Sequence, residues 1–111
     1  MTSLHEYEAW LDSLDARFAV RDGRLLSSLG AGFSVPLVQM KTEAEVLDAA
    51  DRFWTSLLEG GEALPRHYLF ERFHRLAFGE RHSMTFDRFA HQFLVRHPEV
   101  ERSDILGWRG R

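Results

Sequence analysis

Three side chains of one predicted helix, His67, Glu71 and His74, could together bind a metal ion. Offsets of four and seven residues bring them to one helix face, and imidazole with carboxylate is a ligand set that suits zinc or iron. Di-iron bundles need two Glu-x-x-His pairs and two further glutamates, all pointing inward. Here the three residues lie opposite the apolar stripe through Leu69 and Phe73. We therefore expect a solvated face without a tightly bound metal or other cofactor; a metal site at an interface is the alternative.

Nucleophilic and acid–base chemistry has little support in this sequence. Asp87 and His91 are four residues apart and could orient an imidazole as a base, but a helix-start acid with a partner one turn later is the simpler interpretation. No serine stands in a Gly-x-Ser-x-Gly motif, Gly30–Gly32 is too short to be a phosphate-binding loop, and there is no cysteine. His97 continues an apolar helix face and is predicted to be half-buried. We predict that the protein is not an enzyme.

Apolar residues at spacings of three and four predict the helices that would position these side chains. Two capping boxes, Ser3 with Glu6 and Thr42 with Glu45, mark helix starts, and Thr85 is a third cap. The predicted elements are a helix from about Ser3 to Phe18, one or two helical turns through Leu25, Leu26 and Leu29 that end at Gly30, a helix from Thr42 to Gly60, one from Pro65 to Gly79, and one from Thr85 to Pro98.

Residues 31–41 have a different pattern. Phe33, Val35 and Leu37 alternate with polar or proline positions, which indicates extended backbone. Pro36 lacks the N–H that a central strand requires, so the segment is either an edge strand or a packed loop. The fold that we predict is an all-α bundle of four to five short helices in a single domain, 1–111, with one irregular extended segment. The tail, 98–111, either docks on the bundle or stays loose.

Composition limits the class of protein further. Of the 111 residues, 44% are hydrophobic and nine are phenylalanine, which is enough apolar surface to form one core. No run of about 20 uncharged apolar residues is present, and the first residues are acidic where a secretory leader would be basic. We expect a cytoplasmic protein that does not insert into membranes.

Charge is divided unevenly along the chain. Residues 1–63 contain five Lys or Arg against eleven Asp or Glu, whereas residues 64–111 contain nine against six. Such asymmetry predicts that a basic protein partner would contact the first part and any nucleic acid the second. The acidic residues proposed to mimic nucleic acid toward a basic partner are Glu8, Asp12, Asp15, Glu43, Asp48 and Asp51.

The last two predicted helices weakly resemble a helix-turn-helix, a DNA-binding motif. Arg and Gln read guanine and adenine edges, and the outer face of the last predicted helix carries such residues. Against this, the connection is longer than the usual three or four residues, the positive charge is modest, and the acidic half would repel DNA. The residues that would contact nucleic acid are Arg88, His91, Gln92, Val95 and Arg96.

Protein binding requires fewer special features than either of these functions. The segment with Phe33, Val35 and Leu37 could lie along a partner sheet or groove, and Trp108 could serve as an aromatic anchor. The alternative for both is that they fold back into the core. The function that we predict is a small non-catalytic accessory subunit, regulator or inhibitor of a larger protein or ribonucleoprotein, with nucleic acid binding as the alternative. The sequence does not indicate an oligomeric state.

Overall fold

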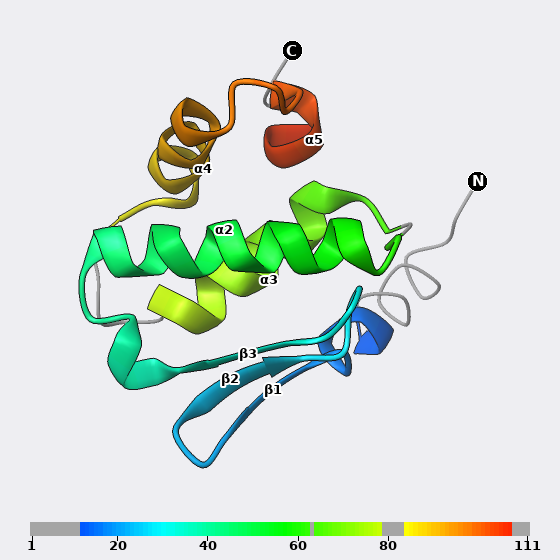
Figure 1. Cartoon of the computed structure of the whole chain (residues 1–111), viewed down its shortest axis with the longest axis vertical. Coiled ribbons are helices and arrows are strands. Elements are labelled where there is room, and N and C mark those ends of the chain that lie inside the picture. The colour runs from blue at the N-terminus through cyan, green and yellow to red at the C-terminus, as the bar shows by residue number, and fades with distance from the viewer. Residues whose placement is uncertain (1–11, 63, 79–83, 108–111) are drawn as a thin grey trace.

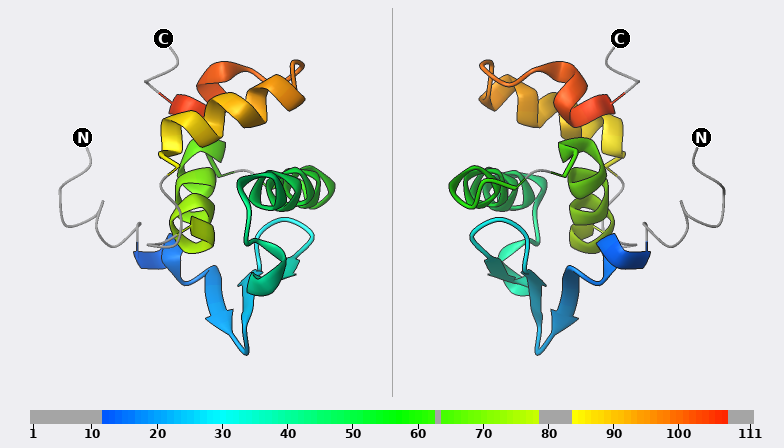
Figure 2. Two further views of the ribbon diagram at one scale, coloured as in Figure 1. Left: turned by 90° about the vertical axis from the view of Figure 1, so that its left-hand side faces the viewer. Right: turned by 90° about the vertical axis from the view of Figure 1, so that its right-hand side faces the viewer.

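The computed structural model describes residues 12–62, 64–78 and 84–107. A three-stranded sheet lies on one side of the paired helices α2 and α3, and α4 with α5 lies on the other (Figures 1 and 2). Residues 12–15 are helical. The further elements, in chain order, are β1 (Phe18–Arg21), β2 (Arg24–Ser27), β3 (Phe33–Pro36), the 3-10 helix η1 (Leu37–Gln39), α2 (Glu43–Glu59), α3 (Arg66–Phe78), α4 (Phe86–Arg96) and α5 (Arg102–Leu106).

The predicted all-α fold is wrong, because an antiparallel sheet of order β1-β2-β3 stands where helix was expected. Asp22 and Gly23 have φ angles of 52° and 73°, the conformation of a two-residue hairpin turn whose twist matches the strands that it joins. Leu25, predicted to be helical, pairs with Val20 on one side and with Val35 on the other. The Asp-Gly pair is typical of a hairpin turn, whereas the spacing of the leucines after it is the same as that of an apolar helix face.

The first predicted helix is too long at its end, because Phe18 already belongs to β1 and pairs with Ser27. The earlier part of that prediction, including the capping box at Ser3, lies outside the described residues. The extended segment is an edge strand, one of the two outcomes predicted for it. Pro36 is the last residue of β3, where the missing N–H removes no ladder bond, and the next N–H, that of Leu37, donates to the carbonyl of Gly23 at 2.8 Å.

The later helix predictions are confirmed in position and in capping. Thr42 and Glu45 form the reciprocal capping box of α2, and the Thr85 side chain accepts from the backbone N–H of Arg88 at the start of α4. The tail also docks, because Ile105 and Leu106 of α5 are buried. No helix in the described ranges has the length and apolarity needed to cross a membrane.

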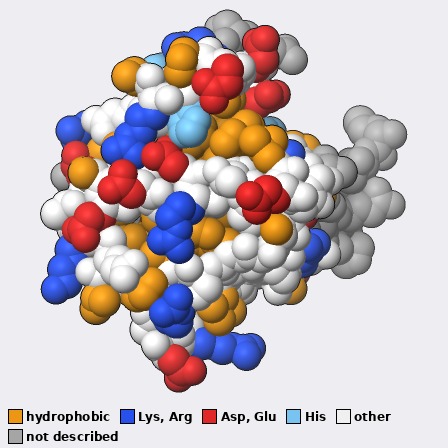
Figure 3. Space-filling model, in the orientation of Figure 1, with side chains coloured by type: hydrophobic (Ala, Val, Ile, Leu, Met, Phe, Trp, Pro, Cys, Tyr) orange, Lys and Arg blue, Asp and Glu red, His pale blue; other side chains and the backbone are white. Residues whose placement is uncertain are grey.

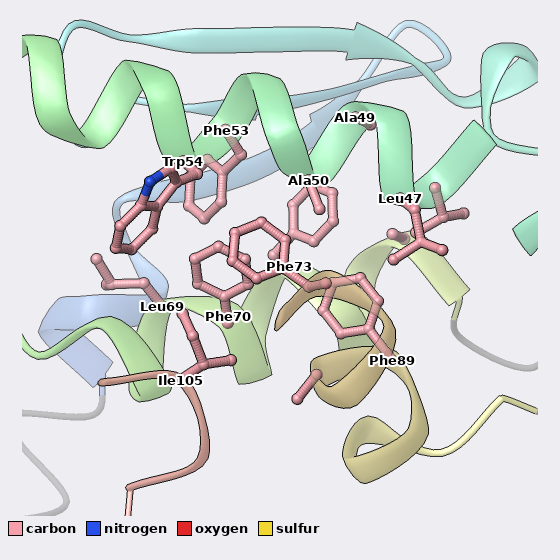
Figure 4. Close-up of a cluster of buried hydrophobic side chains, with 14 of the residues drawn as sticks. Leu47, Ala49, Ala50, Phe53, Trp54, Leu69, Phe70, Phe73, Phe89 and Ile105 are labelled. Atoms are coloured by element: carbon pink, nitrogen blue, oxygen red, sulfur yellow. The ribbon is translucent and has the colours of Figure 1, made fainter. Parts of the chain in front are cut away.

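Aromatic side chains from α2, α3 and α4 fill the centre of the molecule (Figure 4). The rings of Phe53 and Phe73 stack with centroids 5.2 Å apart, and Phe70 lies 4.9 Å from Phe93. Phe33 brings the sheet into the same cluster through an edge contact with Phe53 at 5.3 Å. One continuous core therefore joins the sheet to the helices.

Backbone meets backbone where the loop after β2 crosses the end of α2. A Cβ on Gly60 would lie 2.0 Å from the carbonyl carbon of Gly30, and one on Gly30 would lie 2.4 Å from the carbonyl oxygen of Ser56. The same crossing is hydrogen-bonded: Ala31 N–H donates to the Ser56 carbonyl at 3.0 Å, and the Ser56 hydroxyl donates to the Gly32 carbonyl at 2.8 Å. The glycines at 30 and 60 thus permit close packing.

This crossing predicts that Gly60→Ala destabilises the protein by at least about 2 kcal/mol, because the added methyl overlaps backbone that has no side chain to move away. Gly61→Ala is the matched control: position 61 has open space but a φ of 61°, so only conformational strain of about 1 kcal/mol is expected. Urea unfolding of both variants measures the difference. Equal losses would show that the crossing tolerates a methyl group.

Phe73→Ala and Phe89→Ala should each destabilise by about 3 kcal/mol or more, because each removes a fully buried ring and leaves a cavity. Val95→Ala is the control, since Val95 is 82% exposed and should change the free energy of unfolding by less than about 0.5 kcal/mol. Urea melts that show losses under about 1 kcal/mol at both phenylalanines would contradict the assignment of the core.

Candidate binding surface

The basic residues of α4 are hydrogen-bonded to the acidic residues of α2. Arg96 Nη1 donates to Asp48 Oδ1 at 2.9 Å and to Asp51 Oδ2 at 2.6 Å, and Arg88 Nη2 donates to Glu43 Oε2 at 3.3 Å. The hydrogen bond that Arg96 donates to Asp48, and to a smaller extent the one to Asp51, raises the pKa of the Arg96 guanidinium, although burial opposes the shift. Figure 3 shows red and blue side chains side by side over these helices.

In the folded chain the acidic and basic parts are not separate at α2 and α4, and the predicted division of partners between them stays a prediction. The acidic and basic parts of the sequence meet along α2 and α4, so the charges of Asp48 and Arg96 offset each other. The proposed acidic face is also not continuous: Asp15 forms an ion pair with Arg72 of α3, away from the acids of α2, and Asp12 is exposed in the helical residues 12–15. Glu8 lies outside the described residues.

His97 joins the same cluster and is half-buried, as its position after the apolar face of α4 suggested. Its ring stacks on Phe93 with centroids 4.3 Å apart. Nε2 lies 2.7 Å from Asp51 Oδ1, and Nδ1 lies 3.3 Å from Glu99 Oε1. Both ring nitrogens therefore have carboxylate partners, and the residue ties the end of α4 to α2.

His91 is held by contacts within the chain. Its Nδ1 lies 2.7 Å from the carbonyl oxygen of Asp87, and Arg102 Nη2 lies 3.0 Å from its Nε2. A guanidinium can only donate, so Nε2 accepts and Nδ1 donates to the carbonyl. The partner of His91 Nδ1 is thus the backbone carbonyl of Asp87. Gln92 is partly buried.

Around His91 the surface forms a shallow hollow of about 250 Å³ where α4 turns into α5. Val95, on its rim, is 82% exposed, the highest value among the large hydrophobic residues described as exposed. Sequence reasoning placed Val95 on the outer face of α4 but missed the residues that the turn at Pro98 brings beside it. We call this surface the α4–α5 corner, and it is lined by His91, Leu94, Val95, Pro98, Val100 and Arg102.

The extended segment faces inward. Val35 is buried, Leu37 packs against the core, and Phe33 contacts Phe53 and Phe73. The segment therefore folds back into the core, which was the alternative prediction for it. These three side chains do not form an exposed docking strip. Trp108 lies outside the described residues, as do residues 79–83 of the α3–α4 connection.

The face with His67, Glu71 and His74 was predicted to be solvated, but all three residues are partly buried. His74 is half-buried against Phe78 and Phe89, with its Nε2 2.9 Å from the carbonyl oxygen of Met84. The α3–α4 connection brings Met84 over this side of α3, which a projection of α3 alone could not show. Among the described residues, no three His, Asp or Glu side chains are grouped so as to share a metal ion.

Comparison with protein-family models, with curated proteins and with solved structures found no match to this chain.

Burial lowers the pKa of His74 below its ordinary value of 6.5, although the bond to Met84 and the charge of Glu71 oppose the shift. As the pH falls, His74 is therefore protonated in the unfolded chain at a higher pH than in the folded chain. The stability that neutral His74 contributes is complete above about pH 6.5 and is lost as the pH falls toward the lower pKa of the folded state. His74→Gln keeps a neutral donor and removes the titration. We expect the stability difference between parent and variant to be smaller at about pH 5.5 than at about pH 7.5 in urea melts. A constant difference would contradict this role.

Proposed function

We propose that the chain is a small, non-catalytic binding protein of the cytoplasm that acts as an accessory subunit, regulator or inhibitor by contacting a larger protein through the α4–α5 corner. The observation that carries this proposal is the exposed Val95 beside an apolar hollow. A hydrophobic centre with a polar rim, here Arg102 and His91, is the usual composition of a protein–protein contact. The hollow beside Val95 also offers a partner side chain a place to bind.

Nucleic acid binding, the alternative, has less support from the geometry. Arg88 and Arg96 would have to leave their carboxylate partners before they could contact phosphate, and the acidic residues of α2 lie beside them. Phosphate neutralisation by free Lys and Arg supplies most of the affinity of such proteins. A protein partner requires neither rearrangement, and we therefore prefer it.

A photo-reactive amino acid in place of Val95 tests the proposal inside cells. We expect a cross-link to a specific protein from position 95 and none to that protein from Val38, which is 66% exposed on η1 and does not line the corner. Val95→Asp should weaken binding of the identified protein at least about tenfold, because a charge enters an apolar contact. Val38→Asp is the matched control and should bind like the parent.

Two results would contradict the proposal. Equal cross-linking from positions 95 and 38 would show that the corner is not the contact surface. A cross-link to nucleic acid from position 95, with no protein adduct, would instead support the alternative function. Urea melts of both aspartate variants should stay within about 0.5 kcal/mol of the parent, which separates lost binding from lost folding.

A further inference from the structure

The two edges of the sheet differ in how their outward backbone groups are covered. In an antiparallel pair, residues whose backbone groups bond to the neighbouring strand alternate with residues whose backbone groups point away from it. Because Leu37 N–H bonds to the Gly23 carbonyl, the backbone groups of Ser34 and Pro36 point away from β2. Arg52 covers that edge by donating to the Ser34 carbonyl at 3.3 Å while its guanidinium lies over the Phe33 ring. Pro36 has no N–H to offer. One outward acceptor of the β3 edge is therefore occupied and one outward donor is missing, which disfavours the addition of another strand there.

The β1 edge lacks such cover within the described part of the chain. The hairpin turn and the bond from Ser28 N–H to the Arg17 carbonyl place the inward pairs of β1 at Arg21 and Ala19, so the N–H and C=O groups of Phe18 and Val20 point outward. The structure describes no hydrogen bond to these four groups. Val20 is 47% exposed.

A hollow of about 350 Å³ runs along this edge, between β1 and α3. The consecutive residues Phe18, Ala19 and Val20 all line it, and consecutive strand residues point to opposite faces, so the hollow follows the backbone edge and not one face of the sheet. Figure 2 shows α3 standing over this strand. Its other walls are Leu76, Asp15, Arg72 and Arg75.

Among the charged residues that line this hollow, arginine outnumbers aspartate. Arg75 is exposed on the α3 side and Arg21 at the end of β1, and the described residues contain no ion pair for either. The one acid of the hollow, Asp15, is already paired with Arg72. An approaching carboxylate would therefore meet Arg75 without first displacing an acidic side chain.

We propose that the β1 edge is a second interaction surface, which binds an extended acidic segment of a partner protein as a fourth strand. Backbone groups of the segment would bond to Phe18 and Val20, the usual source of affinity in strand addition. Side chains of opposed residues lie on the same face of a sheet. The residues of the segment that lie directly opposite Phe18 and Val20 therefore point to the face on which α3 lies. One such residue, if apolar, enters the hollow beside Leu76, and an acidic residue two positions away reaches Arg75.

A synthetic peptide with this pattern, Thr-Val-Thr-Glu-Thr-Val-Thr with blocked ends, tests the proposal by amide NMR titration of the intact chain. We expect shifts centred on Phe18–Val20 and α3. A lysine in place of the peptide's glutamate should weaken binding at least about fivefold, because it would face Arg75. N-methylation of alternate peptide amides should abolish binding, because it removes the backbone donors.

Protein variants locate the same contact. Arg75→Glu should weaken the peptide at least about fivefold, whereas Lys41→Glu, the same change of charge on an exposed residue outside the hollow, should not. Val20→Pro removes an outward N–H and leaves the β1–β2 ladder intact, so it should lose binding while its urea melt stays cooperative. Val20→Thr should retain binding.

Several outcomes would overturn the proposal: no titratable binding, shifts centred on Ser34, equal affinity for the lysine or N-methylated peptide, or a folded Val20→Pro variant that binds like the parent. Val95→Asp should leave the peptide affinity unchanged, because the α4–α5 corner is a separate surface. Failure at the β1 edge and failure at the corner are therefore distinguishable.

Discussion

The close contact between Gly30 and Gly60 is the constraint on which the rest of the structure depends. At this point the loop that leaves β2 touches the backbone at the end of α2, and no side chain separates them. The bonds from Ala31 to Ser56 and from Ser56 to Gly32 hold the loop in place. Because β3 follows this loop directly, its position against α2 is determined here.

From that contact the core follows. With β3 held along α2, the ring of Phe33 reaches Phe53 and Phe73, so the sheet and the helices bury one common set of aromatic side chains. Arg52, also on α2, is brought over the outward carbonyl of Ser34. The close approach of Gly30 and Gly60 therefore brings Phe33 into the core and Arg52 over the β3 edge. No comparable contact covers the β1 edge in the described part of the chain.

On the opposite side of α2, the contacts with α4 include ion pairs and hydrogen bonds between side chains. Asp51 contacts both Arg96 and His97, so the end of α4 is tied to α2 just before the chain turns at Pro98. The turn then returns Val100 and α5 to the core, which shapes the apolar hollow next to Val95. Exposed ion pairs contribute little stability individually, and the buried face of α4, with Phe89 and Phe93, also holds this helix against the core.

What the sequence by itself determined is local. The capping box of Thr42 and Glu45, the cap at Thr85 and the apolar stripes of the three long helices are spelled out by neighbouring residues, because caps and helical faces depend on spacings of three and four. For the segment that forms β3 the sequence left two outcomes, an edge strand or a packed loop, because Pro36 cannot donate to a ladder.

Tertiary structure decided what depends on partners distant in sequence. Leu25 is a strand residue because β1 and β3 pair with it, His74 is half-buried because Met84 covers it, and Arg96 is neutralised by Asp48, which lies 48 positions earlier. Periodicity within one segment contains no information on which other segment will lie beside it, and for that reason the sheet, the charge pairing and both proposed surfaces appear only in the folded chain.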